Sequence, residues 1–237
     1  MLNKIRISNP QLYQLMKTYK LGLVGAYHDV IGVRRESGSP NNNGGGSVPN
    51  ADHIPPRDSL QKAYDILQQK GMTEAFRTEH PALYEIMVGK DKQLCREVLA
   101  HHHQLALTTG NSREAQSTRA ELTKVLLSGD SVKLMKMSLL LSNPEVSESL
   151  RRDAGISRHQ NRLDYLSGEE IQAYHKVGNR LLVDGYSALG LFTYTQREEL
   201  QDWLDRGELY SDKTAEYQQL LASIRDANNK KQLKRKR

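Results

Sequence analysis

The chain has 237 residues, of which 37% are hydrophobic and 26% charged, with a formal net charge of +6. That length suits one medium domain or two small ones. No apolar run reaches the roughly 18–20 residues that a membrane-spanning helix needs, so we expect no membrane insertion. The single cysteine, Cys95, excludes an internal disulfide and is typical of a reducing compartment, so we expect a cytoplasmic protein.

Two segments precede the main run of helical patterning. Residues 1–35 contain an amphipathic helix start at Asn9-Pro10, and 21–33 fit either an extension of that helix or an extended segment. Residues 36–57 hold four of the seven prolines and the Asn- and Gly-rich run 41–46. Nothing in 36–57 is periodic, so we predict a flexible linker there.

Residues 58–226 carry apolar side chains at helical spacing almost throughout. Helix starts are predicted near residues 58, 81, 91, 111, 131, 144, 157, 167 and 195, and a last helix near 217–224. The helix that begins at Asp91 would place Leu94 and Val98 on one face. Strand patterns are scarce, so the predicted fold class is all-α, a multi-helix bundle of about nine to eleven short helices. Residues 131–141 are apolar almost all round and are expected at the centre of the core.

The excess positive charge is confined to the C-terminus. The 28 basic residues of 1–229 balance 28 acidic ones. The remaining six are Lys230, Lys231, Lys234, Arg235, Lys236 and Arg237. A cluster of one sign at a terminus is typical of an unstructured segment, so we predict a disordered basic tail over 227–237. Such a tail attracts nucleic acid or an acidic protein, or merely keeps the chain soluble.

The histidine triplet 101–103 and Cys95 are the residues most suggestive of metal binding. Helical ligands to one ion are spaced by three, four or seven residues. Adjacent histidines point about 100° apart, so these three cannot share one ion. Cys95 and His102 have a suitable spacing, but two ligands make an incomplete site. We therefore interpret His101 as part of an apolar stripe flanked by the other two, and Cys95 as a buried structural thiol. We expect no metal, no cofactor and no catalytic set.

A short segment at 150–166 resembles the helix-turn-helix family of DNA readers. Residues 154–157 match the turn of that family, and the residues that would contact DNA are Arg158, His159, Asn161 and Arg162. The resemblance implies base contacts from the second helix, in the major groove. Two positions depart from the family pattern: Arg151 stands where a small residue is usual, and Asn161 where an apolar one is. The alternative is an ordinary corner between two helices.

Tyrosines flank the expected helix ends between 184 and 211. Tyr186, Tyr194 and Tyr210 lie there, and a ring with a polar end suits either a protein interface or the rim of a core. These patterns leave both alternatives open.

The sequence therefore predicts a non-enzymatic helical interaction protein. It would be an adaptor or accessory subunit of a larger bacterial assembly, related to secretion or conjugation, or a secreted effector, with other proteins as partners. The first alternative is a DNA- or RNA-binding protein that uses 150–166 and the basic tail. The second is a metal-dependent hydrolase whose site residues are scattered along the chain.

Overall fold

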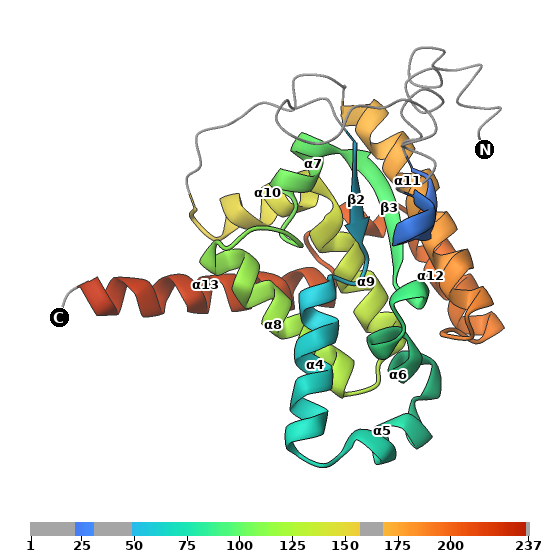
Figure 1. The fold of residues 1–237 in the computed structure, drawn as a ribbon. Helices are drawn as coiled ribbons and strands as arrows, with labels where there is room; N and C mark the ends of the chain where they lie inside the picture. Colours follow the sequence, from blue (N-terminus) through green and yellow to red (C-terminus); the bar gives the residue numbers. More distant parts are fainter. Residues whose placement is uncertain (1–21, 31–48, 157–167, 236–237) are drawn as a thin grey trace.

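The computed structural model describes residues 22–30, 49–156 and 168–235, and only the backbone at 49, 100–101, 168–173 and 231–235 (Figure 1). The described chain is mostly helical, which confirms the predicted class. The helices are α4 (Arg57–Gln69), α5 (Thr73–Glu79), α6 (Pro81–Val88), α7 (Ala100–Leu105), α8 (Arg113–Leu127), α9 (Ser131–Ser142), α10 (Pro144–Asp153), α11 (Gly168–Ala188), α12 (Tyr194–Asp205) and α13 (Ala215–Arg235), with short 3₁₀ helices η1 (Lys90–Lys92) and η2 (Glu208–Tyr210). Across these ranges, none of the helices has both the length and the apolar character that crossing a membrane requires.

Helix α9 lies at the centre of the core, as its nearly continuous apolar sequence predicts. Residues 137–142 of this helix are all buried. Helices α8, α10, α12 and α13 all pack against it. A helix surrounded in this way needs an apolar side chain in almost every direction, which explains why 131–141 lacks a polar stripe.

Side-chain caps fix several helix starts close to their predicted positions. Asn143 accepts hydrogen bonds from the backbone N–H groups of residues 145 and 146. Thr193 and Gln196 form a reciprocal capping box at the start of α12, two residues before the predicted start. Helix α4 begins one residue before its predicted start at 58, after Pro56, and Asp58 in its first turn does not cap it. Its carboxylate lies 3.7 Å from Nε of Arg119 instead.

A three-stranded antiparallel sheet forms beside the helices. The strands are β1 (Val24–Ala26), β2 (Pro49–His53) and β3 (Leu94–Leu99), in the order β1-β3-β2. The helix predicted to begin at Asp91 is therefore wrong over 94–99. Every residue of β3 is buried, and a strand covered on both faces has no alternating pattern to separate it from a buried helix.

The prediction of a flexible linker is also wrong for residues 49–57. Residues 49–53 form β2 and α4 begins at Arg57, whereas 36–48 lie outside the described residues. The prolines of this stretch are compatible with order, because Pro49 is the first residue of its strand and Pro56 immediately precedes a helix. Proline is tolerated at both kinds of position, where no ladder or helix hydrogen bond is lost.

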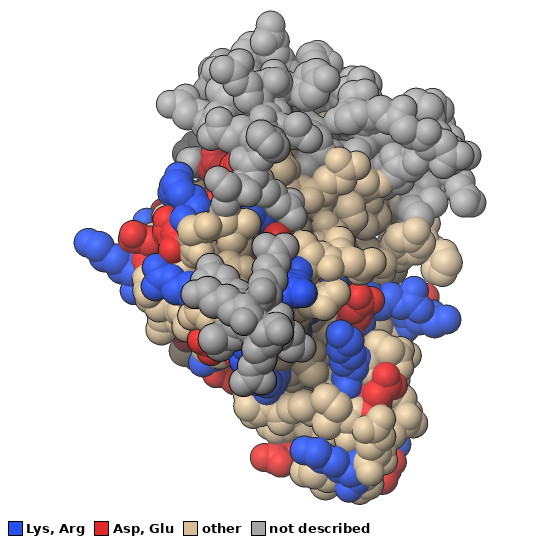
Figure 2. Space-filling model, turned by 90° about the vertical axis from the view of Figure 1, so that its left-hand side faces the viewer, with Lys and Arg blue, Asp and Glu red and all other residues tan. Residues whose placement is uncertain are grey.

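The C-terminal segment predicted to be disordered is helical as far as Arg235. Helix α13 packs against α8, α9 and α10, and its last segment leaves the body of the molecule (Figure 1). Lys, Gln and Arg are good helix formers, so the helix continues beyond its last buried contact. On the face shown in Figure 2, Lys and Arg are interspersed with Asp and Glu over the described surface.

Helix α11 covers one face of β3 at two glycines. A Cβ atom at Gly178 would lie 2.5 Å from Cδ of Arg96, and one at Gly185 would lie 2.7 Å from Cδ1 of Leu94. The backbone N–H of Leu94 donates to the Tyr186 hydroxyl over 3.0 Å. The small residues let the helix approach the strand closely enough to enclose a buried arginine.

Candidate functional site

An acid–base pair, Asp52 and His103, lies where β2 ends and α7 lies beside it, and His53 is the next residue of the strand. Asp52, on β2, is only 2% exposed, and its Oδ1 lies 3.3 Å from Nδ1 of His103 on α7. His53 follows Asp52 in the chain and stacks on the Tyr27 ring, with 5.1 Å between ring centroids. The His103 side chain is 28% exposed, so the pair can be reached from outside.

The sheet register explains how these residues come together. Asp52 pairs with Arg96 and His53 with Cys95 across β2 and β3. Directly opposite residues share a face of the sheet, so Asp52 and His53 lie on opposite faces. Helix α7 follows β3 without a loop and contacts both strands, which brings His103 back to the Asp52 carboxylate.

The two imidazoles have pKa values shifted in opposite directions. Burial lowers the pKa of His53, and the nearby charges of Arg57 and His103 lower it further, against the opposing effect of Asp52. Burial alone would lower the pKa of His103 too, but its hydrogen bond and charge interaction with Asp52 raise it above the ordinary value. The lowered pKa of His53 favours its neutral form, which can accept a proton at neutral pH. The raised pKa of His103 shows that the Asp52 carboxylate favours the protonated imidazole.

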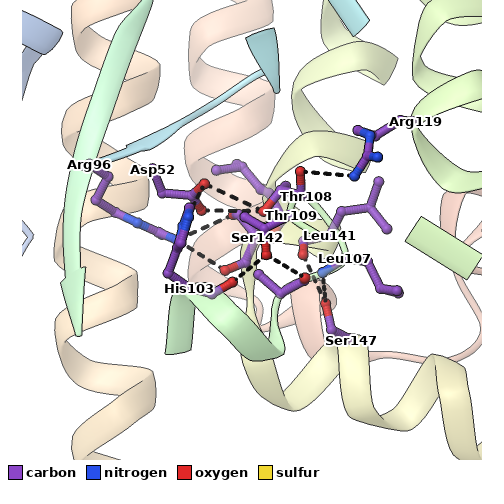
Figure 3. A network of polar contacts seen from close by, with 12 residues as sticks. Asp52, Arg96, His103, Leu107, Thr108, Thr109, Arg119, Leu141, Ser142 and Ser147 are labelled. Carbon is purple, nitrogen blue, oxygen red and sulfur yellow. Dashed lines mark hydrogen bonds and ion pairs between the residues drawn. The ribbon is translucent and has the colours of Figure 1, made fainter. Parts of the chain in front are cut away.

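A turn after α7 contacts both members of the Asp52–His103 pair (Figure 3). Thr108 Oγ1 lies 3.4 Å and 3.5 Å from the two Asp52 carboxylate oxygens. Thr109 Oγ1 donates to the backbone carbonyl of His103 over 2.6 Å. Arg119 on α8 donates from Nη1 to the carbonyl of Thr108 over 3.4 Å.

Arg96 occupies the interior behind Asp52 and has its own acceptors. It is fully buried, and Nη1 donates to the Asn179 side-chain oxygen on α11. Nη2 donates to the carbonyl and hydroxyl oxygens of Ser142, over 3.3 Å and 3.2 Å. Burial lowers the pKa of Arg96, and the Asp52 charge opposes that effect.

A group of aromatic rings lies between α7 and α11. His102 stacks on Tyr174 and its Nδ1 is hydrogen-bonded to the Tyr174 hydroxyl. The His175 ring lies 4.2 Å from Tyr174 and 5.7 Å from His102, centroid to centroid. His175 is fully buried, and neither of its ring nitrogens has a hydrogen-bond partner among the described residues.

The Asp52–His103 spacing is compatible with two neighbouring ligands of one metal ion. Metal–oxygen and metal–nitrogen bonds of about 2.0–2.2 Å put adjacent ligand atoms roughly 3.0–3.5 Å apart. Over the described parts of the chain, no three His, Cys, Asp or Glu side chains form a complete metal cage. An ion held here would keep water molecules in its remaining positions, as Mg²⁺ commonly does.

Of the site residues predicted from the sequence, the ones that the structure describes lie on α13 and not on β2 or α7. Lys230 is exposed on α13, and the backbone of α13 also includes Lys231, Lys234 and Arg235. The rest lie outside the described residues: Arg158, His159, Asn161, Arg162, Lys236 and Arg237. Arg151, a departure from the helix-turn-helix pattern, is buried and donates to the carbonyl of Leu105 over 2.6 Å.

The tyrosines of 184–211 have three different environments. Tyr186 is fully buried against β3, whereas Tyr194 is 76% exposed and Tyr210 is 36% exposed. Cys95 is buried, as expected, although it lies on β3 and not on a helix, and burial raises its pKa.

Asp52, His53 and His103 are not predicted as a group by the sequence patterns. The first two fell inside the predicted linker, and the third was interpreted as a neighbour of an apolar stripe. Two sequence features could have indicated a site: the Asp52-His53 dipeptide, in a chain with eight histidines, and the histidine triplet 101–103. Only the pairing of β2 with β3 shows that these two signals belong together.

Comparisons with protein-family models, curated proteins and solved structures found no match to this chain.

Proposed function

We propose that the protein is a metal-dependent hydrolase of phosphodiesters, with nucleic acid as the substrate class. Asp52 and His103 would bind a divalent ion, and His53 would act as the general base. The observation that supports this most is the 3.3 Å contact between the Asp52 carboxylate and His103. His53 is the next residue along β2. The proposal develops the second alternative from the sequence, with a compact site in place of scattered residues.

Each member of the group has a chemical role in such a reaction. A carboxylate and an imidazole suit Mg²⁺, Mn²⁺ and other first-row divalent ions, and a bound ion stabilises negative charge on the phosphoryl oxygens. A neutral His53 would take a proton from the attacking water. The water oxygen bonds to phosphorus, the bond to the ester oxygen breaks, and that oxygen leaves with a proton from solvent.

The charges around the site support a phosphate substrate. Arg57 is exposed and lies close enough to His53 to lower its pKa, so a cation flanks the proposed base. The six basic residues of 230–237 would add electrostatic attraction for a polyanion.

The test is cleavage of supercoiled plasmid DNA, single-stranded RNA and bis(p-nitrophenyl) phosphate, with Mg²⁺ or Mn²⁺ and with chelator. His53→Ala should lose roughly 10²–10⁴-fold in rate, the usual contribution of a general base. Asp52→Asn and His103→Ala should lose both activity and Mn²⁺ binding. His80→Gln, between α5 and α6 at the opposite end of the molecule (Figure 1), should leave both unchanged. Failure of the wild-type protein to cleave any substrate, or activity that resists chelator, would overturn the proposal.

An interaction protein, such as an adaptor or accessory subunit, is the second candidate function. It is supported by three exposed apolar side chains: Leu181 within α11, Leu189 just after that helix and Tyr194 at the start of α12. Exposed aromatic and aliphatic side chains are typical anchors in protein interfaces. A Leu189→Ser and Tyr194→Ser double variant that loses a partner in pull-downs, while phosphodiester cleavage is absent in the wild type, would favour this function over the hydrolase.

A further inference from the structure

We propose that Thr108 and Arg119 are positioning residues that hold the Asp52 carboxylate and His103 in their metal-binding geometry. This inference rests on the proposed function of the Asp52–His103 site. Neither residue would touch the ion or the substrate. Both would act through the turn that joins α7 to α8.

The turn contacts both proposed ligands at once. Thr108 Oγ1 reaches both carboxylate oxygens of Asp52, at 3.4 Å and 3.5 Å. The neighbouring Thr109 hydroxyl donates to the carbonyl of His103 over 2.6 Å. A displacement of residues 108–109 would therefore disturb a hydrogen bond to Asp52 and another to His103, although these two proposed metal ligands lie on different elements.

Arg119 holds the turn from the opposite side. Its side chain is only 4% exposed, and Nη1 donates to the Thr108 carbonyl over 3.4 Å (Figure 3). Nε lies 3.7 Å from the Asp58 carboxylate in the first turn of α4, a few residues after His53. The guanidinium thus joins the segment that follows the proposed base to the turn that contacts the proposed ligands.

The backbone around Arg119 is fixed independently of its side chain. Ser59 Oγ on α4 and Thr123 Oγ1 on α8 both donate to the Arg119 carbonyl, over 3.1 Å and 3.0 Å. The guanidinium therefore extends from a fixed backbone toward the turn. Hydrogen bonds of this kind behind metal ligands typically account for 10–100-fold in metal affinity.

The experiment measures Mn²⁺ affinity by calorimetry on the full chain, together with kcat and KM for bis(p-nitrophenyl) phosphate. Thr108→Val keeps the shape of the side chain and removes the hydroxyl, so Mn²⁺ affinity should fall about 10-fold or more. Thr108→Ser keeps the hydroxyl and should restore affinity to near the wild-type value. Arg119→Gln should weaken Mn²⁺ binding similarly and Arg119→Lys less, because lysine keeps the charge without the planar fork.

Thr118→Val is the matched control for a buried hydroxyl. Thr118 is fully buried on α8, and within the part of the chain that the structure describes its Oγ1 donates to the backbone carbonyls of Glu114 and Ala115. This variant should leave Mn²⁺ affinity unchanged. Circular dichroism and urea midpoints for every variant separate a loss of fold from a loss of positioning.

The outcomes distinguish the two proposals. If the wild type binds Mn²⁺, Asp52→Asn abolishes binding and Thr108→Val binds like the wild type, only the positioning inference is overturned. If the wild type and Asp52→Asn both fail to bind Mn²⁺ or any other divalent ion, the metal site itself fails and the inference fails with it. If Thr118→Val weakens binding as much as Thr108→Val, the effect is general loosening of the core, which also overturns the positioning role.

Discussion

Asp52 and Arg96 lie opposite each other on adjacent strands, and both are withdrawn from water. Burying a charged group costs several kcal/mol unless its surroundings compensate. Different neighbours compensate the two buried charges. The Nη groups of Arg96 donate to neutral oxygens of Asn179 and Ser142, whereas the Asp52 carboxylate contacts Thr108 and His103.

His175 should make the fold sensitive to acid. Burial holds its pKa well below the ordinary value of 6.5, and the charges of Arg96 and His102 add to that effect. The unfolded chain takes up a proton on His175 near pH 6.5, which the folded chain resists. The free energy of unfolding should therefore fall as the pH drops below about 6.5. His175→Phe should remove this part of the decrease.

The measurement is the urea midpoint of wild type and His175→Phe at pH values between 7.5 and 5. The difference between the two proteins isolates His175 from the other histidines, including His103, whose raised pKa acts in the opposite direction. Parallel curves over this range would show that His175 does not carry the acid sensitivity.

Among the elements, the contact between α11 and β3 depends on Gly178. An alanine there would gain about 1 kcal/mol of helix propensity, but its Cβ would lie 2.5 Å from Cδ of the enclosed Arg96. Overpacking of this kind costs about 1–3 kcal/mol. Since Arg96 is held at both Nη groups and cannot easily move, we expect Gly178→Ala to destabilise the protein by roughly 1–2 kcal/mol.

Gly185→Ala on the same helix is the natural control. Its Cβ would meet only Cδ1 of Leu94, at 2.7 Å, and the end of a leucine side chain can rotate away. This variant should be neutral or slightly stabilising in thermal and urea unfolding. Equal losses for the two alanines would show that the Arg96 contact is not what makes Gly178 sensitive.

The elements differ in how far the sequence predicts them. Helices with one apolar stripe or a cap, such as α4 and α10, begin within one or two residues of their expected positions. Strand β3 could not be predicted because both of its faces are buried and Leu94 and Val98 have helical spacing. Strand β2 lies among prolines and polar residues, and is a strand because β3 pairs with it.

The candidate site could not be derived from spacing for a related reason. Asp52 and His103 are separated by α4, α5, α6, η1 and β3, so no local motif contains both. The predicted helix ran on from residue 91 through 101–103, whereas His103 lies near the end of a separate short helix after a strand. Its neighbours in space are therefore on β2 rather than on its own helix.

At the scale of the whole molecule, the net positive charge comes from the six basic residues of 230–237, since residues 1–229 have no net charge. The last buried residue described on α13 is Ile224, and the six basic residues of 230–237 lie beyond it. A chain ending at Asn229 should keep its urea midpoint. Its affinity for random duplex DNA should become less salt-dependent, with a log–log slope smaller by about 5 if all six charges contact phosphates.

Filter binding across a salt series measures that slope for the full and shortened chains. A shortened chain with an unchanged slope would place the phosphate contacts on the body. A lowered urea midpoint would instead show that the end of α13 contributes to the core.

The path of the chain between β2 and β3 has a consequence for assembly. Residues 54–93 leave the sheet after His53, build α4, α5 and α6, and return to pair with the strand they left. A break in the exposed turn at Lys70-Gly71 would put the proposed base and the carboxylate on one fragment and the partner imidazole on the other. Neither fragment alone would then be active, and mixing them would report directly on whether the two strands find each other again.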